Sequence, residues 1–266
     1  MEKVVFENSW ERFFAQFGLK SFDDFFDYSA GQMIDKNTKR NVQILTFGDE
    51  PDRKVFFMKR FHNPHFKDIV STCGNFGKPI SQAAVEWQNA RLLLSHNIDT
   101  YKPACLGWQT RWGLEKKSFI ITEKLQAMEL TDFLSQIWPK LQQIQKEKII
   151  TAIANLVRRT HDLDITLPDL SVWHFFIDYD GLNDKCRLSV IDLHRMGRGV
   201  KDQNKKIRDL ARFYWSMLPK YFDEELRILF INAYMGSSWH GGKSAFTAKI
   251  LKRVNILAKR QTPKNY

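Results

Sequence analysis

The sequence lacks a hydrophobic run long enough to cross a membrane. A spanning helix needs roughly 18 or more consecutive apolar residues, and no such run occurs in the 266 residues. The first residues, MEKVVFENSWERFF, also lack the basic start, apolar stretch and small-residue cleavage site of a secretory signal. We therefore expect neither a membrane span nor export.

Cysteine is scarce as well. The three cysteines, Cys73, Cys105 and Cys186, are scattered and have no metal-ligand spacing. This pattern excludes a disulfide framework and a cysteine zinc site, and it predicts reduced thiols in a cytoplasmic protein. Internal repeats and low-complexity segments are also missing, so the chain is not a repeat array.

The composition is that of a folded protein with an excess of positive charge. Hydrophobic residues make up 43% and charged residues 27%, which excludes a disordered chain. Lysine and arginine number 41 against 30 aspartate and glutamate residues, a formal net charge of +11. Such an excess suits nucleic acid, a membrane surface or a phosphorylated substrate, but it also suits a simple solubilising surface. Charge alone does not choose among these.

The first part of the sequence is rich in strand patterns. Two β-rich runs, 41–47 and 54–61, flank the turn cluster GDEPDR, which predicts a hairpin with Lys59 on its second strand. The other elements expected here are helices over 9–17 and 81–97, a short helix capped by Ser21 and Asp24, and a buried strand over 119–122.

The second part is mostly helical. Two short strands, 175–177 and 188–191, interrupt helices predicted over 131–137, 147–161, 205–217, 223–235 and 244–259. The sequence therefore predicts an α+β fold of two lobes, a small β-rich lobe over 1–125 and a helical lobe over 126–266, hinged near 123–127.

Five charged or polar positions form an ordered set that matches the needs of phosphoryl transfer from ATP. A strand lysine neutralises phosphates, and a helix carboxylate holds that lysine. A loop aspartate accepts the proton of the attacking hydroxyl, and two later side chains hold the metal. Each position alone has an ordinary structural explanation, such as a solvated charge or a turn cap. In chain order the set is Lys59, Glu86, Asp169, His174 and Asp192.

The segments that carry this set resemble the protein-kinase-like superfamily over roughly residues 40–215. FFMKRF resembles its lysine strand, AVEWQNARLLLSHNI its glutamate helix, and SFIITEKL the strand that enters the hinge. LPDLSVWH stands at the catalytic loop, VIDLHR at the metal-binding segment, and IRDLARFYW at the helix whose Asp209 supports the catalytic loop. The site residues that the resemblance implies are Lys59, Glu86, Glu123 and Leu125 for ATP, Asp169 as catalytic base, and Asp192 with His174 for Mg²⁺.

Departures from the general kinase pattern narrow the family. The chain has no glycine-rich phosphate loop, Leu167-Pro168 replaces the usual His-Arg, and His174 replaces the usual asparagine. With VIDLHR, these features are similar to the bacterial lipopolysaccharide core heptose kinases, the InaA/WaaP-like group. That resemblance implies a single-domain cytoplasmic enzyme, a magnesium-dependent kinase that phosphorylates a sugar hydroxyl, expected to be heptose, of the lipopolysaccharide inner core.

Several points stay open at this stage. Another small-molecule or protein kinase of the same fold, or an inactive nucleotide-binding scaffold, also fits the pattern. Residues 28–40 are the candidate cover for the phosphates. The basic helix over 244–260 is either an ordinary solvated helix or a peripheral contact with the anionic inner membrane. No nucleic-acid partner is expected, because no recognition motif accompanies the charge.

Overall fold

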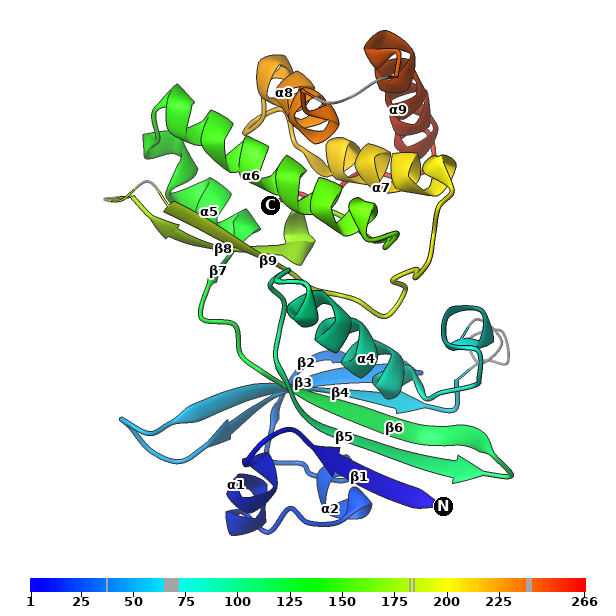
Figure 1. Cartoon of the computed structure of the whole chain (residues 1–266). Coiled ribbons are helices and arrows are strands. Elements are labelled where there is room, and N and C mark those ends of the chain that lie inside the picture. The colour runs from blue at the N-terminus through cyan, green and yellow to red at the C-terminus, as the bar shows by residue number, and fades with distance from the viewer. Residues whose placement is uncertain (37, 65–71, 182, 184, 238–240) are drawn as a thin grey trace. The chain divides into compact units, whose positions relative to one another are not determined.

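The structure is a computed structural model that describes residues 1–36, 38–64, 72–181, 183, 185–237 and 241–266. The chain divides into two compact units, Met1–Leu125 and Gln126–Tyr266. The elements of both units are labelled in Figure 1.

Unit 1 is built on a six-stranded antiparallel sheet in the order β1-β5-β6-β4-β3-β2. The predicted hairpin is confirmed, with Val42 opposite Lys59 in its register. The strands are β1 (Glu2–Phe6), β2 (Gln32–Lys36), β3 (Arg40–Phe47), β4 (Lys54–His62), β5 (Pro103–Arg111) and β6 (Leu114–Glu123).

The two edge strands were not predicted from the sequence. Strand β1 pairs with β5, a partner about a hundred residues away, so no local turn signals it. Strand β2 pairs with β3, and all five of its residues are exposed. It therefore lacks the alternation of apolar and polar residues by which a half-buried strand is recognised.

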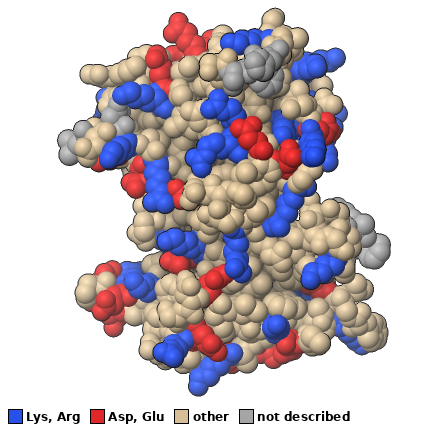
Figure 2. All heavy atoms as spheres, viewed as in Figure 1, with Lys and Arg blue, Asp and Glu red and all other residues tan. Residues whose placement is uncertain are grey.

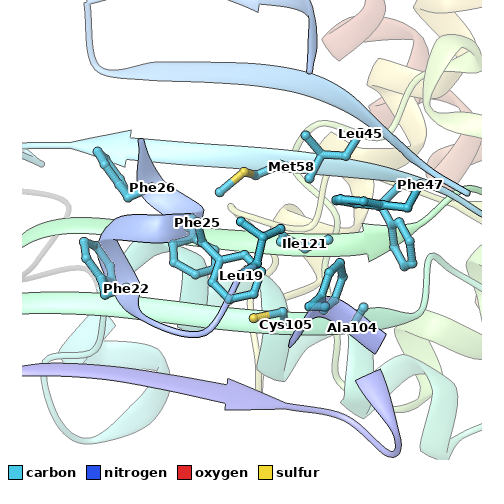
Figure 3. Packing of buried hydrophobic residues seen from close by; sticks show 13 residues of the cluster. Leu19, Phe22, Phe25, Phe26, Leu45, Phe47, Met58, Ala104, Cys105 and Ile121 are labelled. Atoms are coloured by element: carbon cyan, nitrogen blue, oxygen red, sulfur yellow. The ribbon is translucent and has the colours of Figure 1, made fainter. Parts of the chain in front are cut away.

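Helices of the described part of unit 1 cover the two faces of this sheet. Helices α1 (Trp10–Gln16) and α2 (Phe22–Phe26) lie on one face, and α4 (Gln82–Ser95) lies on the other (Figure 1). The predicted capping box at the start of α2 is present, since Ser21 and Asp24 each accept the other's backbone N–H. Figure 3 shows the phenylalanine-rich cluster between α1, α2 and the sheet. The smaller cluster under α4 includes Trp87 and Ile120.

Arg60 anchors α2 to the sheet. Its side chain is only 4% exposed. Its guanidinium donates to Gln43 Oε1 at 2.5 Å and to the carbonyl oxygens of Phe25 and Tyr28 at 3.2 and 2.5 Å. Burial lowers the pKa of Arg60 to about 10. The buried cation thus binds two carbonyl oxygens at and just beyond the C-terminal end of α2, and it ties that end to β4.

Unit 2 packs helices beside a three-stranded antiparallel sheet in the order β7-β8-β9. All five predicted helices are present. The second predicted strand ends at Val190, one residue early, although the Ile191 N–H still donates to His174 O. The elements are β7 (Met128–Glu129), α5 (Leu130–Gln136), η1 (Trp138–Lys140), α6 (Gln143–Asp162), η2 (Val172–His174), β8 (Phe175–Asp180), β9 (Lys185–Val190), α7 (Gln203–Ser216), α8 (Glu224–Met235) and α9 (Lys243–Ala258).

The charged side chains and the cysteines are arranged as the composition predicts. In Figure 2, lysine and arginine side chains are spread over the visible face of each unit and are interspersed with acidic ones. The three cysteines are free, and Cys105 is buried in the core. Among the described residues, no helix combines the length and the apolar character that a membrane crossing requires.

Candidate active site

In unit 1, the strand lysine and the helix glutamate form an ion pair. Lys59 lies on β4 and Glu86 on α4, and the lysine Nζ donates to Glu86 Oε2 at 2.8 Å. The Glu86 side chain is fully buried and that of Lys59 is 20% exposed. An ion pair of this kind fixes the lysine ammonium in one direction, which is what a phosphate-binding lysine needs.

Tyr101 is a member of this group that the sequence did not reveal. Its hydroxyl donates to Glu86 Oε2 at 3.0 Å, and its ring centroid lies 5.8 Å from Lys59 Nζ. Tyr101 stands in the stretch TYKPACLGW, where the sequence predicts a turn but the structure has β5 from Pro103 onward, and no motif surrounds it. Tyr101 reaches Glu86 because the fold places the start of β5 beside α4, and no local sequence pattern indicates this contact.

The expected adenine-binding residues lie at the end of the sheet. Glu123 is the last residue of β6, and Leu125 closes unit 1. The Glu123 N–H already donates to Lys102 O at 2.9 Å, and the Lys124 N–H donates to Val55 O at 3.0 Å. The backbone groups that remain for adenine under our prediction are therefore the Glu123 carbonyl and the Leu125 N–H.

In unit 2, two loops carry the remaining predicted residues and are joined to each other. A short antiparallel bridge links Thr166 and Gly197 through hydrogen bonds of 2.9 and 3.1 Å. Gly197 has no room for a side chain, because a Cβ atom there would lie 2.5 Å from Thr166 Oγ1. The bridge thus holds the loop with Asp169 beside the loop that follows Asp192.

Asp169 presents one carboxylate oxygen that is engaged and one that is not. Oδ1 accepts a hydrogen bond from the exposed Arg195 guanidinium at 3.0 Å. Oδ2 is buried and has no hydrogen-bond partner among the residues that the structure describes. Buried carboxylate oxygens are rarely left unpaired without a functional reason, so Oδ2 is suited to accept a proton.

His174 and Asp192 form a pair with a defined orientation. His174 Nδ1 lies 2.7 Å from the Asp169 carbonyl oxygen, which only accepts hydrogen bonds, so Nδ1 carries the proton. His174 Nε2 lies 3.6 Å from Asp192 Oδ2. Burial lowers the pKa of His174 despite the opposing effect of Asp192, which favours the neutral ring. A neutral ring with protonated Nδ1 exposes the Nε2 lone pair toward the carboxylate.

Asp192 is held in an unusual backbone conformation. Its φ of 63° lies in the left-handed region, which costs a non-glycine residue of order 1 kcal/mol or more. Its Oδ1 lies 2.7 Å from His194 Nδ1. Such strain persists where the surroundings fix the side chain, and here it marks Asp192 as a functional candidate.

Asp209 on α7 supports the catalytic loop from below, as the sequence predicted. Its buried Oδ2 accepts the Leu167 N–H at 2.6 Å and lies 3.3 Å from His161 Nε2. Burial raises the pKa of Asp209, and the two hydrogen-bond partners oppose that effect. His161, whose Nδ1 lies 2.8 Å from the Tyr234 hydroxyl, has no sequence signal of this role beyond its place in a predicted helix, because its partners are 73 and 48 residues away.

These arrangements define a class. A sheet lysine held by a helix glutamate, joined in sequence to a helical unit with a supported catalytic loop and a second aspartate loop, is the pattern of the protein-kinase-like fold. A solved structure described as WaaP in complex with acyl carrier protein matches with a TM-score of 0.73, covers 96% of this chain and 99% of its own, and is 21% identical. That likeness confirms the predicted fold.

The family follows from the sequence. The model of the lipopolysaccharide kinase (Kdo/WaaP) family matches residues 26–234, and the chain belongs to that family. It is similar to the lipopolysaccharide core heptose(I) kinase WaaP of Escherichia coli strain K12, with 28% identity over 204 residues and 75% of each chain covered. A second Escherichia coli WaaP is 26% identical over 186 residues, 68% of each chain. The protein is therefore a kinase, a phosphotransferase with a hydroxyl group as acceptor.

Proposed function

We propose that this kinase transfers the γ-phosphate of ATP to a heptose hydroxyl of the lipopolysaccharide inner core. The family match and the heptose(I) kinases among its relatives support the reaction class and the acceptor. The observation that carries the proposal is the Asp169 carboxylate, whose buried Oδ2 is unpaired among the described residues and whose Oδ1 is oriented by Arg195.

Asp169 acts as the proton acceptor. The acceptor hydroxyl oxygen forms a bond to the γ-phosphorus as the bond from that phosphorus to the bridging oxygen of ADP breaks. The hydroxyl proton passes to Asp169 Oδ2, and ADP leaves. Arg195 holds the other oxygen of the carboxylate, and its exposed guanidinium is also suited to an anionic group of the acceptor.

Asp192 and His174 are the residues that hold the metal ion. The donor set fits a divalent cation, because one carboxylate oxygen and one imidazole lone pair face each other and the Asp169 carbonyl fixes the imidazole tautomer. Magnesium prefers the carboxylate oxygen over the imidazole nitrogen. When bound, Mg²⁺ neutralises the developing charge on the β- and γ-phosphates.

Unit 1 binds the nucleotide. Lys59, oriented by Glu86, binds the α- and β-phosphates. The Glu123 carbonyl and the Leu125 N–H bind the adenine edge. Strand β2 and the first residue of β3 lie within 28–40, the stretch predicted to cover the phosphates. Glycine is needed where the backbone approaches a phosphate closely. A cover for the phosphates that approaches them through side chains needs no glycine-rich sequence.

The enzyme works in the cytoplasm, in peripheral contact with the inner membrane where a lipid-linked acceptor resides. Phe246 and Ile250 of α9 are buried, and its exposed side includes Lys249 and Lys252 but, apart from Leu251, no large apolar residue that is exposed. A better anchor lies at the β5–β6 turn, where Trp112 is 88% and Leu114 46% exposed. The Arg111 guanidinium carbon lies 4.5 Å from the Trp112 ring centroid. Tryptophan beside a cation suits the bilayer interface.

The test is phosphate transfer from ATP to dephosphorylated core oligosaccharide, followed by mass spectrometry. We expect one added phosphate on heptose. Asp169→Asn should lower the rate by at least about a hundredfold while ATP binding survives, and Asp178→Asn, an exposed residue on β8, should leave the rate unchanged. Phosphorylation of generic proteins but not of the sugar would favour another kinase activity. A wild type without transfer to any core acceptor would favour the inactive scaffold.

A further inference from the structure

Residues 264–266 fold back onto the helical unit. The Tyr266 hydroxyl donates to Ser216 O at 2.6 Å and accepts the Leu218 N–H at 3.2 Å. Its ring stacks on that of Tyr221, with centroids 5.8 Å apart and planes 10° apart. Burial raises the pKa of Tyr266, so its hydroxyl stays protonated and able to donate. The segment is thereby fixed to the residues that follow α7.

Ser216 links Tyr266 to the loop that contains Asp169 and His174. Its carbonyl oxygen accepts the hydrogen bond from Tyr266, and its side chain binds that loop. The Ser216 hydroxyl accepts the Val172 N–H at 3.0 Å and donates to Phe213 O at 2.7 Å. Ser216 is fully buried. One residue therefore transmits the position of Tyr266 to the first residue of the η2 turn.

Trp173, the next residue of that turn, is partly buried and contacts the same segment. Lys264 Nζ lies 5.5 Å from the Trp173 ring centroid. The Tyr266 and Trp215 rings pack against Trp173 with centroid distances of 6.4 and 6.1 Å. A cation and an aromatic ring from residues 264–266 thus contact the residue that directly precedes His174.

We propose that Lys264–Tyr266 is a strap that positions the Val172–His174 turn, and with it the metal-facing nitrogen of His174. The proposal deepens the proposed function and rests on it. Since Ser216 fixes Val172 and the strap contacts Trp173, the backbone that carries His174 has little freedom. Tyr266 is accordingly a positioning residue, which acts on the metal pair through the turn.

The deciding variant is Tyr266→Phe, which removes both hydrogen bonds and keeps the ring contacts. Because these bonds fix Ser216 and through it Val172, their loss should speed hydrogen exchange at the Val172 and His174 amides roughly three- to tenfold. Mn²⁺, used as a probe in the absence of ATP, should bind several-fold more weakly. The kcat should fall while the KM for ATP stays constant, because Lys59 and Glu86 belong to unit 1.

Two further variants complete the experiment. Lys264→Met removes the cation over Trp173 and should give a smaller effect of the same kind, about two- to fivefold. Lys259→Met, at an exposed position after α9, is the matched control and should behave as the wild type. If Tyr266→Ala fails to fold, Tyr266→Phe still decides the question.

The outcomes separate the strap from the proposed function. Unchanged amide exchange and unchanged Mn²⁺ affinity in folded Tyr266→Phe would overturn the strap, as would a raised KM for ATP at constant kcat. A wild type that transfers no phosphate contradicts the proposed function, and the strap is then decided by exchange and Mn²⁺ binding. If the wild type binds no Mn²⁺, amide hydrogen exchange at Val172 and His174 is the measurement that decides whether the strap exists.

Discussion

Glu86 carries a fully buried carboxylate whose Oε2 is held by Lys59 and Tyr101. Burying this charged carboxylate is tolerated only while its cation is present, because a buried charge without a partner costs folding free energy. The same contact orients the lysine that we propose binds phosphate. Under that proposal, stability and nucleotide affinity are coupled at this one pair, and paired substitutions can separate them.

Lys59→Met should lower the free energy of unfolding by about 3 kcal/mol, because it leaves Glu86 buried without its cation. Lys59→Met combined with Glu86→Leu should recover most of that loss, since two apolar side chains replace the ion pair. Neither protein should bind ATP with wild-type affinity. Urea unfolding and ATP titration measure the two effects, and recovery of ATP affinity in the double variant would contradict the role of Lys59.

The site residues stay a prediction, which the sequence offers because their order along the chain is specific. Lys59, Glu86 and Asp209 stand in segments whose element type was also predictable. Tyr101 and Tyr266 could not be found, since their partners lie 15 and 50 residues away in the sequence and a tyrosine carries no motif of its own. The contact of His174 with the Asp169 carbonyl, not its carboxylate, was equally out of reach.

At the scale of elements, α2 is too short to be stable by itself. A five-residue helix makes few internal hydrogen bonds, so its stability comes from its capping box and its tertiary contacts. Arg60 supplies the contact at its far end, through the carbonyls of Phe25 and Tyr28. The helix and strand β4 should therefore lose their order together.

Arg60→Met should destabilise unit 1 by about 3 kcal/mol, because Gln43 and two carbonyl groups lose a buried donor. Arg53→Met is the control. Its side chain is 50% exposed and pairs with Glu50 at 3.7 Å, and exposed pairs contribute little. Denaturant unfolding compares the two variants, and equal stability of both would show that Arg60 does not anchor α2.

The accuracy of the sequence prediction varied with how local each element's signal is. The β3–β4 hairpin and helix α4 carry their own turn and capping residues, and both were predicted to within a few residues. Strands β1 and β2 escaped prediction because one depends on a distant partner and the other is exposed throughout. The prediction of a turn over TYKPACLGW was wrong, because Pro103 and Gly107 are typical turn residues and yet lie in strand β5.

At the scale of the whole molecule, the charge of +11 favours anionic surfaces, and on the face seen in Figure 2 the basic side chains are interspersed with acidic ones. Electrostatic attraction to an anionic bilayer contributes about 1 kcal/mol for each basic residue near the surface and is weakened by salt. The exposed Trp112 and Leu114 would add an apolar contact that salt does not weaken.

The wild type should sediment with vesicles containing anionic lipid and much less with neutral vesicles. Trp112→Ala should weaken binding roughly tenfold, by loss of the buried aromatic area, and the remaining binding should disappear at high salt. Ile144→Ala, in which another exposed apolar residue is removed from unit 2, is the matched control. Equal loss in both variants, or binding independent of lipid charge, would contradict a specific role for the β5–β6 turn.

The order of strands in unit 1 has a consequence for synthesis on the ribosome. Strand β6 is the last of the six to be translated, yet it lies between β5 and β4 in the sheet. Strand β1 emerges first and waits for β5, roughly 100 residues later, which takes about 5–20 s at typical translation rates. The nascent β3–β4 hairpin therefore has an open edge until Glu123 emerges, and this interval is when the growing chain depends most on chaperones.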